Sequence, residues 1–303
     1  MSADNIEAGD VAVDTCASCG IAEVDDVKLK PYNGCDLVAY CSDACEKDHR
    51  PEHKEACKER SAELRDEMLF RQPESTHLGD CPICCLPLLD KQQSEFSPCC
   101  SKVICKGCSY ANQNREWEMR LQPSCPFCRH PIPKSQEEAG KRSMKRVAVN
   151  EPAAIRKMGN AVYNKGDYDG AFKYWTRASE LGDADAHYHL SLMYSEGGGV
   201  EKDEEKQLYH LEEAAIAGHP AARHYLGAYE GRNGRFERAV KHYIIAANLG
   251  YNESIQMLKE GYKAGVVSKE DFAAALRAHH AVVNATKSPQ REIAAAWARE
   301  NNE

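Results

Sequence analysis

The sequence has no long apolar run, no leader-like start and no excess of positive charge. No segment approaches the roughly 18 to 20 consecutive apolar residues that a membrane span needs, and Met1 to Asp10 lacks the basic and apolar regions of a signal peptide. The 303 residues include 39 Lys and Arg against 47 Asp and Glu, a formal net charge of −8, which gives no support to a polyanionic partner. We therefore expect a soluble protein of the cytoplasm or nucleus, with no membrane partner and with nucleic acid disfavoured.

Sequence motifs of several enzyme classes are also missing. The patterns GxxxxGK[ST], GxSxG and HExxH occur nowhere, which disfavours a self-contained hydrolase or kinase. With 42% hydrophobic and 28% charged residues, the chain has ordinary globular composition and enough length for roughly two or three domains. All 15 cysteines lie between Cys16 and Cys128. The sequence therefore predicts a metal-rich front part and a metal-free back part.

Four CxxC pairs occur in the front part: Cys16/Cys19, Cys81/Cys84, Cys105/Cys108 and Cys125/Cys128. Two intervening residues allow both thiolates of a pair to reach one zinc ion at about 2.3 Å. A disulfide scaffold is disfavoured by the odd cysteine count and the missing export signal. A thioredoxin-like redox motif needs a βαβ context that the proline-rich surroundings do not offer. We interpret the pairs as halves of structural zinc sites.

The segments CASCG, CDLVAYCSDAC and HKEAC resemble a MYND zinc finger, whose two zinc ions are bound in an interleaved way. Two i,i+4 pairs in these segments can each supply half of a tetrahedron from one helix face. By the resemblance, the first zinc is held by Cys16, Cys19, Cys41 and Cys45. Three ligands of the second zinc are matched by Cys35, His53 and Cys57.

The second MYND site departs from the family at Tyr32, where a fourth cysteine belongs. A phenol is a poor zinc ligand, so the site is either three-coordinate plus water, completed by His49, or without zinc. No nearby pattern supplies a general base, so we interpret the change as decay rather than as a catalytic zinc site. For Cys35 the sequence leaves two alternatives open, a zinc ligand or a small buried side chain.

The segments CPIC, SPCCSKVICKGC and CPFCRHPIP resemble a RING finger. That fold is a cross-brace, in which ligand pairs one and three share one zinc and pairs two and four share the other. Two metals then tie together a segment too short to bury a stabilising core. By the resemblance, the first zinc is held by Cys81, Cys84, Cys105 and Cys108, and the second by Cys125, Cys128 and two further ligands.

The identity of those two further ligands is ambiguous. A common RING finger has a histidine where Lys102 stands, and an ammonium group cannot ligate zinc. We favour Cys99 and Cys100, as in the rarer all-cysteine RING finger, with Cys85 as the spare. Successive side chains of a strand point to opposite faces, so both cysteines can bind one metal only if the backbone turns there. If only one of them ligates, a nearby histidine such as His130 is the alternative.

The RING resemblance implies a function in ubiquitin transfer. RING domains of ubiquitin ligases have no nucleophile of their own and act by orienting a charged ubiquitin-conjugating enzyme. By the resemblance, the candidate contacts are Ile83, Pro126, Phe127 and Arg129, the last with a planar five-donor head that suits bridging. The alternative is that Ile83 and Phe127 form the core of a small metal domain and that Arg129 is a solvated charge.

Helices are expected on both sides of the second cysteine cluster. The charged segment 42–71 predicts an extended helix, because opposite charges recur three or four residues apart. Trp117 lies on a predicted helix over 111–121, where it either rims the docking groove or, as we favour, packs in a core. Residues 135–150 contain a small basic patch to which we assign no function.

The back part is dominated by internal repeats. Gly182, Gly218 and Gly250 recur at spacings of 36 and 32 residues, and each is followed by a small residue after four positions and by leucine after eight. This pattern predicts an α-solenoid of helical hairpins, because one hairpin cannot cover its own apolar face. The segment from Glu151 to about Ala285 resembles Sel1-like repeats, relatives of the tetratricopeptide repeat, which bind proteins on a concave surface. Beyond them, an amphipathic stretch is expected to pack as a cap.

The sequence thus predicts small zinc-stabilised α+β modules followed by an all-α solenoid of helical-hairpin repeats. The expected divisions are a disordered tail over 1–10, a MYND-like finger over 11–60, a helical linker over 61–80, a RING-like finger over 81–133, a linker over 134–150, Sel1-like repeats over 151–287 and a C-terminal cap or tail over 288–303. Three to four zinc ions are expected per chain. The favoured function is a RING-type ubiquitin ligase or ligase subunit that recruits a conjugating enzyme through the RING and a protein client through the repeats and MYND finger. The alternative is a non-catalytic zinc-binding interaction scaffold.

Overall fold

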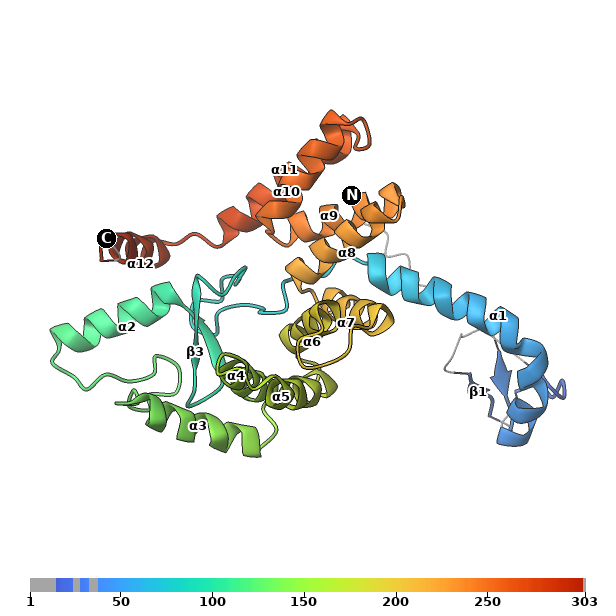
Figure 1. The fold of residues 1–303 in the computed structure, drawn as a ribbon, viewed down its shortest axis with the longest axis horizontal. Coiled ribbons are helices and arrows are strands. Elements are labelled where there is room, and N and C mark those ends of the chain that lie inside the picture. The colour runs from blue at the N-terminus through green and yellow to red at the C-terminus, as the bar shows by residue number, and fades with distance from the viewer. Residues whose placement is uncertain (1–14, 24–27, 33–37, 302–303) are drawn as a thin grey trace. The chain divides into compact units, whose positions relative to one another are not determined.

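The computed structural model describes residues 15–23, 28–32 and 38–301, and the chain divides into two compact units, 1–71 and 72–303 (Figure 1). Cys35 and the predicted tail over 1–10 lie outside the described residues. Within the described ranges, none of the helices combines the length and apolar character that crossing a bilayer requires.

The first unit is a small two-stranded hairpin followed by one long helix. Strand β1 (Lys30–Pro31) pairs antiparallel with β2 (Ala39–Tyr40), and helix α1 spans Asp43–Phe70. Ser42 caps α1, because its side chain accepts a hydrogen bond from the backbone N–H of Cys45 at 3.3 Å. The helix predicted over 42–71 is therefore present, and it places Cys45 in its first turn, beside Cys41.

The second unit begins with a cysteine-rich finger built on a β-hairpin and a helix. Strands β3 (Ser94–Ser97) and β4 (Lys102–Cys105) are antiparallel, with Ser97 opposite Lys102, and α2 (Lys106–Glu118) follows directly. The buried core of the finger consists largely of cysteine side chains together with Leu88 and Ile104. With so little apolar side chain to bury, we expect the finger to depend on metal ligation for its stability.

The rest of the second unit is helical. Its helices are α3 (Gln136–Ala148), α4 (Pro152–Tyr163), α5 (Tyr168–Glu180), α6 (Ala184–Glu196), α7 (Glu204–Ile216), α8 (Pro220–Arg232), α9 (Phe236–Asn248), α10 (Asn252–Lys263), α11 (Lys269–Ala285) and α12 (Pro289–Glu300). The hairpins α4–α5, α6–α7 and α8–α9 stack in sequence order (Figure 1). The predicted all-α solenoid is confirmed.

The repeat positions identified in the sequence form the solenoid core. Ala186, Ala222, Ser254, Leu190, Leu226 and Leu258 are all buried. The three repeat glycines, Gly182, Gly218 and Gly250, end their helices with φ between 82° and 87°, a conformation that favours glycine. The small residue therefore permits close helix approach, and the glycine ends each hairpin.

Two segments near the ends of the solenoid differ from the prediction. Residues 136–148, expected to belong to a linker, form helix α3, which is capped by Ser135 and buries Val147 in the core of the first repeats. Helix α12, expected to pack as a cap, lies against α2 of the cysteine-rich finger, where Trp297 contacts Tyr110 at a centroid distance of 5.5 Å. Sequence periodicity shows that these segments have an apolar side but does not show which partner covers it.

Candidate metal centres and binding groove

Four sulfur atoms of the first unit gather in one group. Cys16, Cys19, Cys41 and Cys45 place their Sγ atoms within 4.8 Å of one another. The distances Cys19 to Cys41 and Cys41 to Cys45 are both 3.6 Å. A tetrahedron with zinc–sulfur bonds of about 2.3 Å has edges of roughly 3.8 Å, so the four sulfurs fit a tetrathiolate zinc site.

The finger of the second unit holds two further groups of four sulfurs, and their pairs alternate along the chain. The first group contains Cys81, Cys84, Cys105 and Cys108, and the second contains Cys99, Cys100, Cys125 and Cys128. In the first group, Cys84 lies 3.7 Å from Cys105; in the second, Cys99 lies 3.3 Å from Cys128. Pairs one and three thus converge on one point, and pairs two and four on another.

Both members of the Cys99–Cys100 pair reach the second group because the backbone turns between the strands. The N–H groups of Cys100 and Ser101 both donate to the carbonyl of Ser97, and Ser101 adopts φ 58°. Cys100 then lies 3.9 Å from Cys125. Lys102 starts β4 opposite Ser97 and is outside the group, as are Cys85 and His130.

The CxxC turns share one backbone geometry. The residue after the second cysteine of the pair has positive φ in three of them: Gly20 at 73°, Cys85 at 54° and Arg129 at 63°. In these turns an N–H donates back to the carbonyl of the first cysteine, as from Arg129 to Cys125 at 2.9 Å. The N–H groups of the two preceding residues, Ser18/Cys19, Ile83/Cys84 and Phe127/Cys128, donate to the sulfur of the first cysteine.

One thiol in each group is prepared for metal binding by these N–H groups. Burial alone raises the pKa of Cys16, Cys81 and Cys125, but backbone N–H donors to the sulfur outweigh it. The resulting pKa is about 6 for Cys16 and about 7 for Cys81 and Cys125. Because thiolate is the ligand form, these three sulfurs are the ones that we expect to bind zinc first near neutral pH.

In the part of the chain that the structure describes, the second zinc site predicted for the MYND-like finger does not form a group of four sulfurs as the first one does. His53 is buried, which together with nearby His49 lowers its pKa, and its ring contacts Tyr32 edge-on at 6.2 Å and stacks on His49 at 5.6 Å. Nδ1 of His49 lies 3.0 Å from the hydroxyl of Tyr40. Within the described residues, His53 and Cys57 join no group of three or more ligands. Their partner Cys35 is outside those residues, so zinc binding here stays a prediction.

A fourth group, His77, Asp185 and His219, resembles a metal site in geometry but not in charge. Both histidine Nε2 atoms lie 3.2 Å from Oδ1 of Asp185. The same carboxylate already pairs with Lys91 at 2.6 Å and with Arg156 at 3.3 Å. Two cations on one carboxylate leave little attraction for a metal ion. Nδ1 of His219 accepts from the N–H of Ala222, so Nε2 carries the proton and donates to Asp185.

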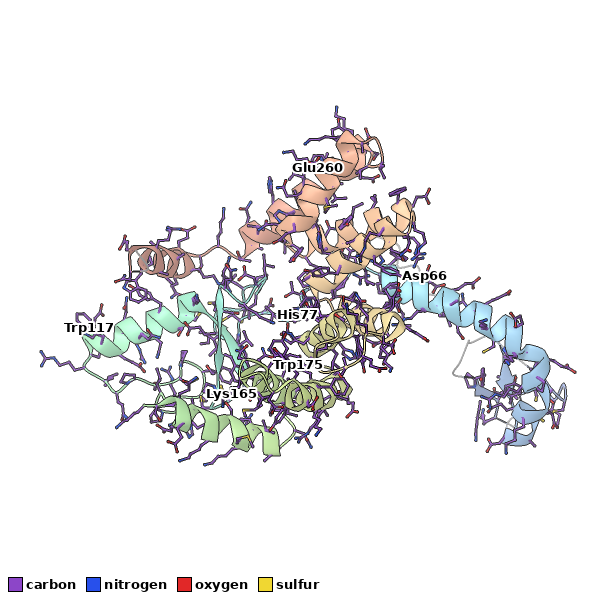
Figure 2. The ribbon with its side chains drawn as sticks, in the orientation of Figure 1. Asp66, His77, Trp117, Lys165, Trp175 and Glu260 are labelled. Carbon is purple, nitrogen blue, oxygen red and sulfur yellow. The ribbon has the colours of Figure 1, made fainter. Side chains whose placement is uncertain are left out.

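This network therefore attaches the finger to the repeats. His77 and Lys91 belong to the chain around the finger, whereas Asp185, Arg156 and His219 belong to the helical repeats (His77 is labelled in Figure 2). Asp185 is 2% exposed, and although burial acts to raise its pKa, the hydrogen bond from His219 and the nearby His77 and Arg156 hold the pKa well below the usual range. No sequence motif indicates this network, because its members are scattered over more than a hundred residues.

Three of the candidate docking residues of the finger, Ile83, Phe127 and Arg129, are exposed, and the fourth, Pro126, is half-buried. Ile83 is 40% exposed and Phe127 is 43% exposed, while Leu88 and Ile104 form the apolar core. Nη1 of Arg129 lies 3.4 Å from Oδ1 of Asn112. The expectation that Trp117 packs in a core is wrong: it is 82% exposed, near the end of α2 remote from the β-hairpin (Figure 2). It borders a groove of about 980 Å³ that also includes Leu121.

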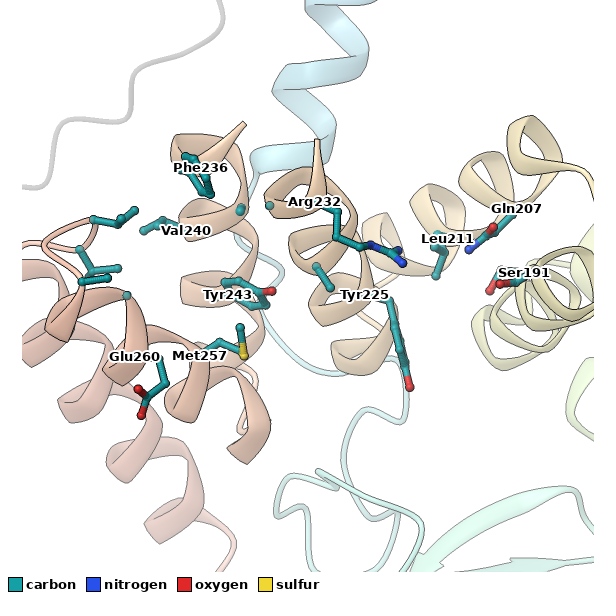
Figure 3. Close-up of a pocket in the computed structure, with 18 of the residues that line it drawn as sticks. Ser191, Gln207, Leu211, Tyr225, Arg232, Phe236, Val240, Tyr243, Met257 and Glu260 are labelled. Carbon is teal, nitrogen blue, oxygen red and sulfur yellow. The ribbon is translucent and has the colours of Figure 1, made fainter. Parts of the chain in front are cut away.

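A second groove crosses the repeats (Figure 3). It has a volume of about 810 Å³, and its lining comes from α6 to α10 and the turn that follows α10. Apolar lining dominates, with Leu211, Tyr225, Phe236, Tyr243 and Met257 among the contributors. An open, mostly apolar groove of this size suits an extended or helical peptide segment better than a small polar molecule.

Comparisons with known proteins place two modules on the chain. A model of the MYND finger matches residues 16–57, and a model of the Sel1 repeat matches residues 152–183, 184–219 and 220–251. Neither model covers 58–151. Chitin synthase regulatory factor 4 of Schizosaccharomyces pombe is 28% identical over 134 residues, which cover 42% of this chain and 21% of that protein.

Two solved structures are also similar. The Sel1 repeat protein from Oxalobacter formigenes is 30% identical with a TM-score of 0.43, over 50% of this chain and 66% of that one. The second is c5321, titled a protective antigen of uropathogenic Escherichia coli strains with an SLR fold. It is 16% identical with a TM-score of 0.42, over 57% of this chain and 37% of that one.

Proposed function

We propose that this chain, a zinc-binding scaffold for protein interactions that carries a MYND finger and three Sel1 repeats, acts as a RING-type ubiquitin ligase or ligase subunit. The proposal assigns a MYND-like finger to 11–60, a RING-like finger to 81–133 and Sel1-like repeats to 151–287. We place the activity in the cytoplasm or nucleus, where thiols stay reduced and available to zinc.

The alternation of sulfur pairs in the second unit carries the proposal. Two zinc sites that share their ligands in the order one–three and two–four form a cross-brace, which is the arrangement that the RING resemblance implies. A simple series of zinc knuckles would instead pair neighbouring CxxC turns. Each site would hold its zinc through four thiolates and leave no open coordination position, so the metal is structural and the finger has no hydrolytic centre of its own.

The exposed residues on the two CxxC turns give independent support. Ile83 and Phe127 are each about two-fifths exposed, although the finger is short of apolar core, so their side chains contribute little to its stability. Arg129 holds φ 63° where Gly20 has the corresponding place in the MYND finger. An arginine in the left-handed region costs backbone energy that glycine avoids, which favours a role for its side chain. A ubiquitin-conjugating enzyme is the partner that this arrangement suits.

The test is discharge of ubiquitin from charged conjugating enzymes to free lysine. Zinc-loaded protein is incubated with a broad panel of such enzymes beside the variants Ile83→Ala and Arg129→Ala. Ile21→Ala is the matched control, since Ile21 is 48% exposed but lies in the first unit. We expect acceleration of discharge that either finger variant reduces at least about tenfold, as removal of an orienting contact does. Discharge no faster than with the variants, across the panel, would leave only the scaffold.

The client is proposed to bind in the groove of the repeats. Its mostly apolar lining, to which Arg232 and Glu260 add one charge of each sign, fits a peptide segment that presents apolar side chains. Tyr225→Ala and Met257→Ala remove two side chains that are each more than 40% exposed. We expect them to weaken client capture without changing discharge to free lysine, so the two halves of the proposal are measured separately.

A further inference from the structure

Arg291, on the first turn of α12, reaches the zinc cluster of the finger from the far end of the chain. Its Nη2 atom lies 3.5 Å from Sγ of Cys84 and 3.0 Å from the carbonyl oxygen of Leu86. Its Nη1 atom lies 2.8 Å from the carbonyl oxygen of Pro87 and 3.1 Å from that of Thr286. The guanidinium is thus held by three carbonyl groups in a position that directs it at a ligand sulfur.

Among the described residues, the counterpart to the charge of Arg291 is the group of sulfurs that would hold the metal. In the described part of the chain, no carboxylate forms an ion pair with Arg291. A zinc ion bound by four thiolates carries a formal charge of about −2. A half-buried guanidinium next to that cluster compensates the charge and donates a charge-assisted hydrogen bond to one sulfur.

The helix that carries Arg291 is held against the finger at close range. A Cβ atom on Gly107, which lies between the ligands Cys105 and Cys108, would come within 2.8 Å of the backbone nitrogen of Arg291. Trp297 packs on Tyr110, and Ala294 between these two contacts is buried. Ser288 caps the helix by accepting from the N–H of Arg291 at 3.3 Å. The side chain is therefore preorganised at the cluster.

We propose that α12 is a clamp for the first zinc site of the finger, and that Arg291 slows the loss of zinc from Cys81, Cys84, Cys105 and Cys108. Arg291 is a positioning residue that does not ligate the metal. It holds the turn that carries Cys84 in place, and its positive charge reduces the repulsion among the four thiolates. Retention of this zinc then depends on the C-terminal helix. The inference does not rest on ligase activity, because it concerns metal retention alone.

The experiment measures zinc release and cysteine exposure in the full zinc-loaded chain. Zinc transfer to a chromogenic chelator is followed in time, and alkylation of each cysteine by N-ethylmaleimide is followed by mass spectrometry. The test variant is Arg291→Gln. The control is Arg299→Gln, which removes an exposed arginine from the same helix.

In Arg291→Gln we expect alkylation of Cys81, Cys84, Cys105 and Cys108 to accelerate about 10- to 100-fold, the usual effect of losing an outer-shell partner of a metal ligand. The MYND sulfurs of the first unit, Cys16, Cys19, Cys41 and Cys45, should react as in the unaltered chain. Acceleration of less than about twofold at the first finger site, or equal acceleration at the MYND cysteines, would overturn the proposal.

A second variant, Gly107→Ala, tests the proposal independently in case Arg291→Gln does not fold. Gly107→Ala mutates neither Arg291 nor any sulfur ligand and favours helix α2, but its methyl group would come within 2.8 Å of the backbone nitrogen of Arg291 and so forces α12 to shift from the finger. We expect it to accelerate alkylation of the same four cysteines, whatever its effect on discharge of ubiquitin. An unchanged alkylation pattern in Gly107→Ala would contradict the clamp even if Arg291→Gln did not fold.

Discussion

Replacing Asp185 with asparagine tests the buried network that attaches the finger to the repeats. The side chain is 2% exposed, and asparagine has nearly the same shape, so the change removes charge and leaves packing alone. It deprives Lys91 of a partner at 2.6 Å and Arg156 of a partner at 3.3 Å. It also puts an amide, which can donate, next to the protonated Nε2 of His219.

The loss in the free energy of unfolding depends on which charges stay buried without a partner in Asp185→Asn. Removing one partner of a buried ion pair costs about 3 to 5 kcal/mol, because the remaining charge is left without compensation. Arg156 keeps Asp183 at 2.9 Å, and the side chain of Lys91 is 47% exposed and can turn to water. We therefore expect the lower end, a loss of about 3 kcal/mol in the free energy of unfolding.

Urea unfolding of the zinc-loaded chain at neutral pH, followed by tryptophan fluorescence, measures this loss. Asp203→Asn is the matched control, because Asp203 caps α7 and pairs with Lys206 at the surface, and asparagine caps a helix as well as aspartate. The control should change the unfolding free energy by less than about 0.5 kcal/mol. A loss for Asp185→Asn that does not exceed the control would refute the reasoning that charge pairing, rather than apolar packing, secures this junction.

Three further outcomes follow from the structure. Burial lowers the pKa of His219 to about 4, so this residue binds more protons in the unfolded chain below pH 6.5. Its own contribution to stability, complete above that pH, should fall by roughly 3 kcal/mol on acidification to pH 4. Urea titrations should show this as a flatter dependence on pH for His219→Asn than for the unaltered chain. Trp175→Ala, at a site 2% exposed, should lose about 3 to 5 kcal/mol in thermal or urea unfolding, whereas Trp117→Ala, at a site 82% exposed, should change stability by less than about 0.5 kcal/mol. Elemental analysis should give three to four zinc ions per chain, one fewer in Cys99→Ser and the same number in Cys85→Ser, because only Cys99 belongs to a sulfur group; equal zinc loss in both would contradict this assignment.

Most of the fold could be predicted from local sequence patterns. A CxxC turn is determined by a few consecutive residues, so spacing alone indicates which sulfurs can share a metal. The burial of Leu190, Leu226 and Leu258 likewise follows from helical periodicity, because stacked hairpins bury the same face in each repeat. These elements depend on neighbours that are close in sequence or that recur at a regular interval.

The features that sequence analysis missed depend on distant partners. Asp185 gathers Lys91 and Arg156 from segments before it and His219 from a segment after it, and nothing in its own helix distinguishes it from a surface aspartate. Trp117 was expected in a core because tryptophan usually is, yet it lies at the end of α2 where no other element covers it. Helix α3 was interpreted as part of a linker because its segment is rich in polar and charged residues, and the sequence does not show that the first repeats cover Val147.

The contact between Arg291 and Cys84 spans 207 residues, and this separation affects how the protein matures during synthesis. At about 5 to 20 residues per second, a ribosome needs roughly 10 to 40 s to make the stretch between the two residues. The cysteines of the finger therefore emerge, and can meet zinc, well before the arginine exists. A chain whose translation stops before residue 291 would have the four cysteines of the first finger site but would lack Arg291.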